Sequence, residues 1–154
     1  MSRFVLARGD PAPAFTAETT EGTRSLDELL ADGPLVLVFY VEDATPACTA
    51  QLGAFRDDYA TVRELGATVL AVSADGMESH RAFADRAVLP FPLAADADLA
   101  IARAYGVVNL DDPQRTRRAV FVIGADGAIL DARVPYQPSV GEQFAAMFGA
   151  LGVG

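Results

Sequence analysis

Runs of apolar residues separated by polar turns divide the chain into short predicted strands and helices. The clearest run is 35–40, six apolar positions rich in β-branched and aromatic types and bounded by polar residues. Such a run is typical of a strand that is buried on both faces near the middle of a sheet. Similar patterns predict further strands at 15–20, 67–73, 119–123 and 128–134, the last two joined as a hairpin. Prolines are expected to keep the extended segment 90–93 out of a central ladder.

Apolar residues at spacings of three and four predict the helices. The longest begins after Thr45 and carries the apolar stripe Leu52, Phe55, Tyr59, Val62 and Leu65. Shorter helices are expected after Ser25 and at 77–86, 98–105 and 139–151, with an exposed polar loop at 106–116 and a solvated His80. This order of elements predicts an α/β fold in which one domain, 1–154, holds a central mixed sheet flanked by helices.

The composition limits the classes of function. The 154 residues are half apolar and carry a net charge of −9, which argues against nucleic acid and anionic membrane surfaces as partners. No apolar run approaches the roughly 20 residues of a membrane span, and the first residues lack the apolar region of a signal peptide, so a cytoplasmic protein is expected. One cysteine and one histidine exclude an intramolecular disulfide and argue against a metal site, and no cofactor is expected.

The single cysteine lies where a helix favours an anion. Thr45 and Pro46 are typical of the N-cap and the first residue of a helix, which puts Cys48 at the third helical position. Unpaired backbone N–H groups and the helix dipole stabilise a thiolate there, and a thiol pKa near ~8.5 can fall to roughly 3.5–7.5 in such surroundings. The residues alone also allow a small buried hydrophobic residue, because Cys48 lies on the apolar stripe four residues before Leu52.

The segment around Cys48 resembles the active-site segment of the peroxiredoxins, the AhpC/TSA family. It reads FYVEDATPACTAQ over 39–51, and its TPACT core resembles the branch of the bacterioferritin comigratory protein, or PrxQ-like branch. The likeness runs from 9–15 to 118–123 and the hairpin that follows, nearly the whole chain. It implies a thioredoxin-like fold.

The resemblance also implies roles for three residues. Cys48 is then the peroxidatic cysteine, which attacks the terminal oxygen of a peroxide and becomes a sulfenic acid. The Thr45 hydroxyl holds the thiolate and the peroxide, in addition to or instead of a plain N-cap role. Arg118 lowers the thiol pKa and orients the peroxide. Arg117 is the neighbouring candidate, and since side chains alternate along a strand only one of the two faces the site; alignment to 121–123 favours Arg118.

The chain departs from the family pattern at two positions. Val41 stands at the place of the active-site proline, and because valine leaves φ free and keeps its N–H, we expect poorer shielding of the thiolate. Gly53 stands at the place of the resolving cysteine of the PrxQ-like branch. Gln51, at a position where many relatives carry Glu or Gln, is expected either to orient the loop by hydrogen bonding or to be solvated.

These features together predict a one-cysteine, thiol-dependent peroxidase. Its substrates would be hydrogen peroxide or organic hydroperoxides, and an external small thiol, thioredoxin or glutaredoxin would reduce the sulfenic acid at Cys48. Thr45, Val41, Gln51 and Arg118 would contact the substrate, and the protein would be a monomer or a homodimer. Two other hypotheses stay open: a non-catalytic redox sensor, and a structural thioredoxin-fold module whose thiol is buried with an ordinary or raised pKa.

Overall fold

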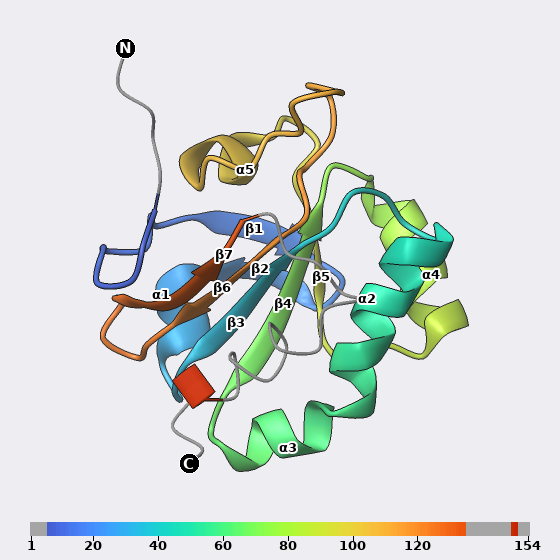
Figure 1. Cartoon of the computed structure of the whole chain (residues 1–154). Helices are drawn as coiled ribbons and strands as arrows, with labels where there is room; N and C mark the ends of the chain where they lie inside the picture. Colours follow the sequence, from blue (N-terminus) through green and yellow to red (C-terminus); the bar gives the residue numbers. More distant parts are fainter. Residues whose placement is uncertain (1–5, 135–148, 151–154) are drawn as a thin grey trace.

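The computed structural model describes residues 6–134 and 149–150. A mixed sheet of seven strands forms the centre of this part of the chain, in the order β2-β1-β5-β4-β3-β6-β7 (Figure 1). The strands are β1 (Thr16–Thr19), β2 (Gly22–Ser25), β3 (Leu35–Phe39), β4 (Thr68–Ser73), β5 (Leu93–Ala95), β6 (Ala119–Ile123) and β7 (Ile129–Arg133).

The strand expected near the middle of the sheet is β3, and this prediction is confirmed. It pairs in parallel with β4 and antiparallel with β6, and all five of its residues are buried. Parallel pairing continues one residue beyond the strand, where the Tyr40 N–H donates to the Val72 carbonyl at 3.1 Å. The register pairs Phe39 with both Val72 and Ala119. The chain segment after Phe39 therefore starts beside the beginning of β6.

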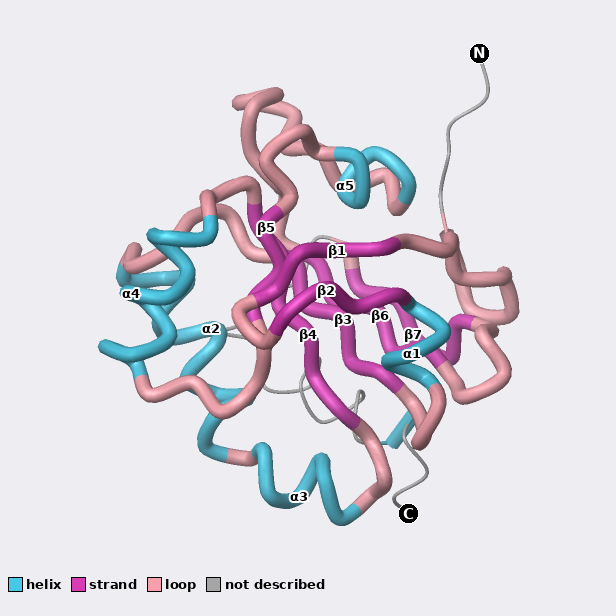
Figure 2. Tube along the Cα trace, turned by 180° about the vertical axis from the view of Figure 1, so that it is seen from behind, coloured by secondary structure: helices cyan, strands magenta, loops and turns pink. Residues whose placement is uncertain are grey.

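Helices cover both faces of the sheet, as the two views in Figures 1 and 2 show. The helices are α1 (Leu26–Leu30), α2 (Pro46–Asp57), α3 (Tyr59–Glu64), α4 (Met77–Ala87) and α5 (Ala100–Ala104). Leu35, Leu37 and Phe39 pack with residues of α1 and α5, whereas Val36 and Val38 pack with residues of α2, α3 and α4. Alternate side chains of one strand thus build two separate cores.

Two sequence predictions differ from the structure, one strand was not predicted, and one predicted helix lies largely outside the described residues. The helix expected from Thr45 to Leu65 ends at Asp57, and α3 begins anew at Tyr59, because Asp58 has a non-helical backbone (φ −104°, ψ 13°). Adjacent aspartates at the negative end of a helix favour such an interruption. The polar strand β2 was not predicted. The segment after Pro92 forms β5, an inner strand between β1 and β4, although the prolines themselves stay outside it. The helix expected at 139–151 lies outside the described residues, except for helical 149–150.

Candidate active site

Cys48 lies in the first turn of α2, immediately beyond the end of β3. Thr45 is the N-cap residue, with an extended backbone, and its hydroxyl accepts a hydrogen bond from the Cys48 N–H at 3.4 Å. The same hydroxyl donates to the Glu42 carbonyl at 3.3 Å, which ties the start of the helix to the preceding loop. Pro46 occupies the first turn, where its missing N–H leaves no bond unmade. The predicted helix start is confirmed, and the thiol is only 1% exposed.

The Arg118 side chain reaches the thiol from the start of β6, the strand that pairs antiparallel with β3. Because Phe39 pairs with Ala119, the residue before β6 lies next to the loop that leaves β3. The Arg118 Nη2 is 3.4 Å from the Cys48 Sγ, and its Nε donates to the Gln51 Oε1 at 2.8 Å. Gln51 is fully buried and its Nε2 donates to the Phe39 carbonyl at 3.3 Å. Gln51 therefore holds the guanidinium toward the sulfur, and the alternative that Gln51 is solvated is wrong.

The surroundings of Cys48 favour its thiolate. Burial by itself raises the pKa of the thiol, and it is the largest single influence. Hydrogen bonds to the sulfur outweigh this effect and lower the pKa below its ordinary value. They come from the Thr45 hydroxyl, the Arg118 guanidinium and the backbone N–H groups of Glu42 and Val41. The site is thus built to stabilise negative charge on sulfur.

The structure brings four of the predicted site residues to the thiol: Thr45, Val41, Gln51 and Arg118. Val41 takes part through its N–H, a group that proline at this position would lack. The Arg117 side chain is not the one that contacts sulfur; the N–H of Arg117 donates to the Val107 carbonyl. Catalytic and substrate-binding roles for these residues stay predictions.

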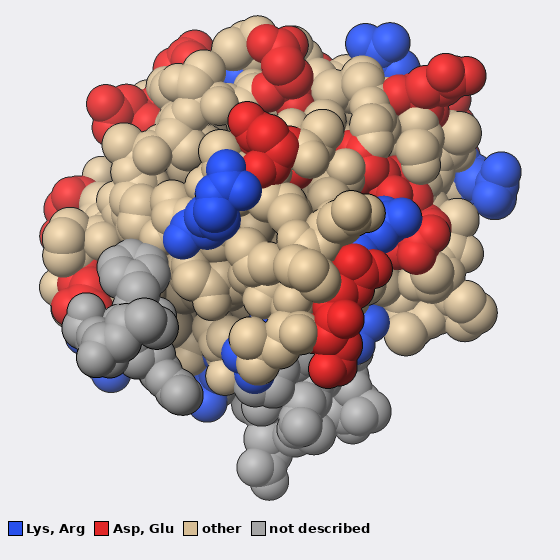
Figure 3. Space-filling view, turned by 90° about the horizontal axis from the view of Figure 1, so that it is seen from above, with Lys and Arg blue, Asp and Glu red and all other residues tan. Residues whose placement is uncertain are grey.

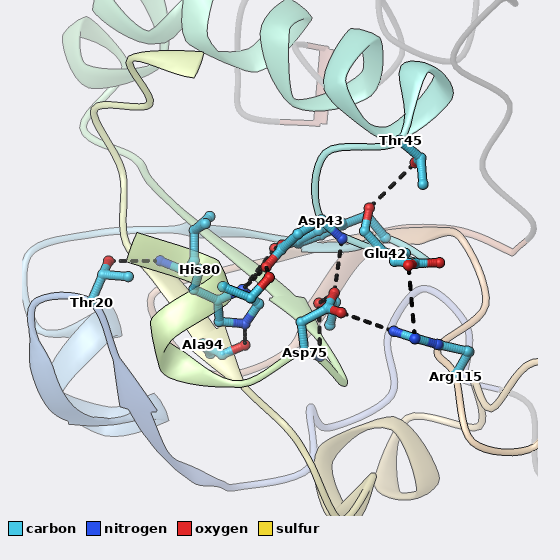
Figure 4. Close-up of polar contacts among 12 residues, drawn as sticks. Thr20, Glu42, Asp43, Thr45, Asp75, His80, Ala94 and Arg115 are labelled. Carbon is cyan, nitrogen blue, oxygen red and sulfur yellow. Dashed lines mark hydrogen bonds and ion pairs between the residues drawn. The ribbon is translucent and has the colours of Figure 1, made fainter. Parts of the chain in front are cut away.

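A buried polar cluster beside the site was missed by the sequence reasoning. His80 of α4 is completely buried, so the prediction of a solvated histidine is wrong. Its ring contacts the Asp43 carboxylate (Figure 4). The same carboxylate accepts a hydrogen bond from the Tyr40 hydroxyl. A histidine amid the polar residues of a helix gave no sign of this, because its side-chain partners, Tyr40 and Asp43, come from the segment that follows β3. The available signal was the pair of carboxylates, Glu42 and Asp43, that follows that strand in the sequence.

Three further observations concern the surface and the side chains of the described residues. Over the face in Figure 3, arginine side chains lie among carboxylates and form no continuous basic area. Within 6–134 and 149–150, no helix has both the length and the hydrophobicity needed to cross a membrane. The same residues hold no cluster of three or more His, Cys, Asp or Glu side chains suited to a metal ion.

Comparison with known proteins identifies the family. The sequence pattern described as "AhpC/TSA family" matches residues 8–132. The chain belongs to the AhpC/TSA family. It is 36% identical over 129 residues to a peroxiredoxin bcp of Coxiella burnetii, covering 79% of this chain and 83% of that protein. It is 34% identical over 124 residues to the chloroplastic peroxiredoxin Q of Sedum lineare, covering 80% of this chain and 67% of that one.

Solved structures agree with this assignment. The peroxidoxin BcpB of Mycobacterium tuberculosis superposes with a TM-score of 0.86 at 29% identity, over 95% of this chain and 96% of that one. Peroxiredoxin Q of Xanthomonas campestris gives 0.80 at 26% identity, over 88% and 89%. The fold is thioredoxin-like, as the resemblance implied. Membership of the family supports a thiol-dependent peroxidase activity, with a peroxide as substrate and a thiol as reductant.

Proposed function

We propose that this protein reduces hydrogen peroxide and organic hydroperoxides as a one-cysteine peroxidase, with Cys48 as its only redox-active group. The observation that carries the proposal is the contact between the Cys48 sulfur and the Arg118 guanidinium at the start of α2, in a thiol whose pKa is lowered. Cys48 is the single cysteine of the 154 residues, and Gly53 stands where the PrxQ-like branch has its resolving cysteine.

In the oxidative step, the Cys48 thiolate attacks the oxygen of the peroxide that bears hydrogen. An S–O bond forms and the O–O bond breaks, so that sulfur loses two electrons and becomes a sulfenic acid, and the leaving alkoxide or hydroxide takes a proton from water. Arg118 and the N–H groups that face the sulfur stabilise the negative charge as it moves from sulfur to the leaving oxygen. The Thr45 hydroxyl is placed to hold the peroxide because it can both donate and accept.

In the reductive step, an external thiol attacks the Cys48 sulfenic acid and releases water, which forms a mixed disulfide. A second thiol then attacks that disulfide, restores the Cys48 thiol and leaves as an oxidised pair. One peroxide and two thiols thus give one alcohol or water, a further water and one disulfide. The external thiol is a small thiol, thioredoxin or glutaredoxin.

The lowered pKa of Cys48 counts against the structural-module hypothesis, which expects an ordinary or raised value. The redox-sensor hypothesis differs in turnover, because a sensor is oxidised once and stays oxidised. The cytoplasmic location and the monomeric or dimeric state stay predictions; the relatives from Sedum lineare and Triticum aestivum carry chloroplastic names.

The test is the rate of reaction between the reduced protein and hydrogen peroxide or an organic hydroperoxide, measured by stopped flow. Sulfenic acid is trapped with a dimedone reagent and located by mass spectrometry, and Cys48→Ser serves as the blank. We expect a rate constant well above that of a free thiol, trapped sulfenic acid at Cys48, and repeated turnover when a thiol reductant is added.

Two results would contradict the proposal. A rate equal to that of a small thiol with every peroxide would mean that the protein has the fold but lacks the peroxidase activity. This result would favour the structural-module hypothesis. Fast oxidation without turnover by small thiols, thioredoxin or glutaredoxin would favour the sensor.

A further inference from the structure

A buried polar cluster lies behind the loop that precedes Cys48. Its centre is the Asp43 carboxylate, which accepts from the Tyr40 hydroxyl and from the Ser79 hydroxyl, the latter at 2.7 Å. The His80 ring completes the cluster: Nδ1 is 2.8 Å from the carboxylate, and Nε2 is 2.9 Å from the Ala94 carbonyl oxygen (Figure 4). Tyr40 and His80 are both fully buried. These four side chains and one carbonyl come from the segment that follows β3, from α4 and from β5.

Both ring nitrogens of His80 face acceptors. A carbonyl oxygen can only accept, so Nε2 carries a hydrogen; an ionised carboxylate can only accept, so Nδ1 carries one as well. Burial alone would raise the pKa of Asp43, but the hydrogen bonds from His80, Tyr40 and Ser79 outweigh it and lower the pKa below its ordinary value. From this geometry we expect His80 to be an imidazolium paired with the Asp43 carboxylate, because each group then meets the other's buried charge.

The main chain of Asp43 is held as firmly as its side chain. Its N–H donates to the Asp75 Oδ2 at 2.8 Å, and the same carboxylate accepts from the Ser73 hydroxyl at 2.7 Å. The other oxygen of Asp75 accepts from Arg115 at 2.9 Å, and Arg115 also lies 3.8 Å from the Glu42 carboxylate. Asp43 is thus fixed from two sides to the end of β4 and to the loop at 106–116.

The loop held in this way carries the groups that face the sulfur. The N–H groups of Val41 and Glu42 come from the residues just before Asp43, and Thr45 follows two residues after it. Ala44, between Asp43 and Thr45, has a positive φ of 64°, a backbone conformation that a residue with a Cβ keeps only when its neighbours are fixed.

We propose that Asp43, clamped by Tyr40 and His80, is a positioning residue that holds the 41–45 loop around Cys48 without itself touching the sulfur. In this proposal the cluster acts on the thiol through the position of the loop and not through its own charge. It keeps the N–H groups and the Thr45 hydroxyl within contact distance of the sulfur. The inference deepens the proposed function, but the acidity of Cys48 tests it whether or not the protein turns over peroxide.

The decisive variant is Tyr40→Phe, which removes one hydrogen bond to Asp43 and changes no charge. Its matched control is Tyr105→Phe, because Tyr105 is also buried and its hydroxyl donates to the Pro13 carbonyl at 2.8 Å, in the core on the opposite face of the sheet. The pH dependence of Cys48 alkylation by iodoacetamide gives the thiol pKa of each, and urea unfolding checks that both are folded. We expect Tyr40→Phe to raise the pKa of Cys48 and to slow alkylation at neutral pH roughly three- to tenfold, and Tyr105→Phe to change the rate less than about twofold.

The Asp43→Asn variant distinguishes a positioning role from an electrostatic one, because the two roles predict opposite changes in the pKa of Cys48. Loss of a nearby negative charge would by itself lower the pKa of Cys48, whereas a displaced loop raises it. We expect a rise. An unchanged pKa of Cys48 in Tyr40→Phe, or a lowered pKa of Cys48 in Asp43→Asn, would overturn the proposal.

The charge on His80 has its own measurement, because the chain contains a single histidine. Nitrogen-15 spectra of the wild-type ring at neutral pH should show both nitrogens protonated, and a neutral ring with one protonated nitrogen would contradict the ion pair.

Discussion

The Cys48 sulfur is surrounded by groups from two separate parts of the chain. The 41–45 loop supplies two backbone N–H groups and the Thr45 hydroxyl, and the residue before β6 supplies the Arg118 guanidinium. Gln51 links the last of these to β3 by two hydrogen bonds. The acidity of Cys48 is therefore a property of the folded chain and is absent from the unfolded one.

The reactivity of Cys48 should show this acidity as a function of pH. Alkylation by iodoacetamide requires the thiolate, so its rate should rise with pH and level off with a midpoint below the ~8.5 of a free cysteine. The free energy of unfolding should also depend on pH, in a direction that the lowered pKa of Cys48 determines. Because the folded-state pKa is lower than the unfolded-state pKa, the stabilisation is present above the unfolded value and is lost as the pH falls through the folded value.

The free energy of unfolding of the wild type, relative to Cys48→Ser, should therefore increase between the folded-state pKa and pH ~8.5. Urea unfolding at a series of pH values measures this difference. A flat difference across that range would mean that the thiol has an ordinary pKa.

Removing the Arg118 guanidinium should weaken the stabilisation of the Cys48 thiolate. In Arg118→Ala we expect the pKa of Cys48 to rise and the peroxide rate to fall by roughly 100-fold, the usual cost of losing one donor to developing negative charge. Arg117→Ala is the control, since its side chain is not the one that contacts sulfur. Stopped-flow rates and alkylation profiles of both variants check this, and equal effects would show that the two arginines share the role.

Val41→Pro tests the departure from the family pattern. Proline would remove the N–H that helps to lower the pKa of Cys48, so we expect a higher pKa and a slower reaction with peroxide. The sequence alone suggested the opposite, better shielding and hence a faster reaction. Alkylation and stopped-flow measurements on the folded variant decide between these effects.

At the scale of single residues, the sequence predicted those features that depend only on neighbouring residues in the chain. The helix start at Thr45 and Pro46 placed Cys48 correctly, because N-cap preferences depend on neighbouring residues. The burial of His80 could not be predicted, because a polar ring is buried only where its nitrogens find hydrogen-bond partners, and the carboxylate that meets Nδ1 lies 37 residues earlier in the chain.

Among the elements, α4 ends with a strained residue. Val88 has φ 55° and ψ 55°, a left-handed conformation that is unfavourable for a β-branched side chain, and the side chain is 73% exposed. It occupies a place where helices usually have glycine.

Val88→Gly should therefore stabilise the protein. Relief of the strain exceeds the extra freedom of glycine in the unfolded chain, and little packing is lost, so we expect a gain of about 0.5–1 kcal/mol in the free energy of unfolding. Thermal and urea unfolding measure the gain. Val88→Ala is the control, because it keeps a Cβ at the same backbone conformation and should gain much less.

The elements that could be predicted are those with a strong apolar period. The strands β3, β4 and β6 are continuous apolar runs and were placed correctly. The strand β2 was missed because its residues are polar or small and carry no apolar pattern. It pairs with β1 through the backbone ladder and through polar side chains, such as the Thr23 hydroxyl that donates to the Glu18 carboxylate at 2.8 Å. The short β5 is an inner strand because its neighbours β1 and β4 supply the hydrogen bonds, which no local pattern encodes.

For the molecule as a whole, one cysteine limits the products of oxidation. A disulfide can form only with another molecule, and Cys48 is 1% exposed in the folded chain. When peroxide is added without a thiol, we expect the mass to increase by one oxygen atom first, with disulfide-linked dimers forming more slowly. Intact-mass spectra over time, beside non-reducing gels, measure both. Dimers that appear before any sulfenic acid would show that the thiol is accessible to a second copy.

The antiparallel pairing of β3 with β6 has a consequence for the protein while it is being made. Cys48 and Arg118 are 70 positions apart, and only this pairing brings them together. Until the ribosome has released β6, the growing chain contains a cysteine without its guanidinium and without the strand that orders the loop. The nascent polypeptide thus carries a thiol without these contacts until β6 has been made, and the groups that stabilise negative charge on the sulfur gather around it only when β6 has paired with β3.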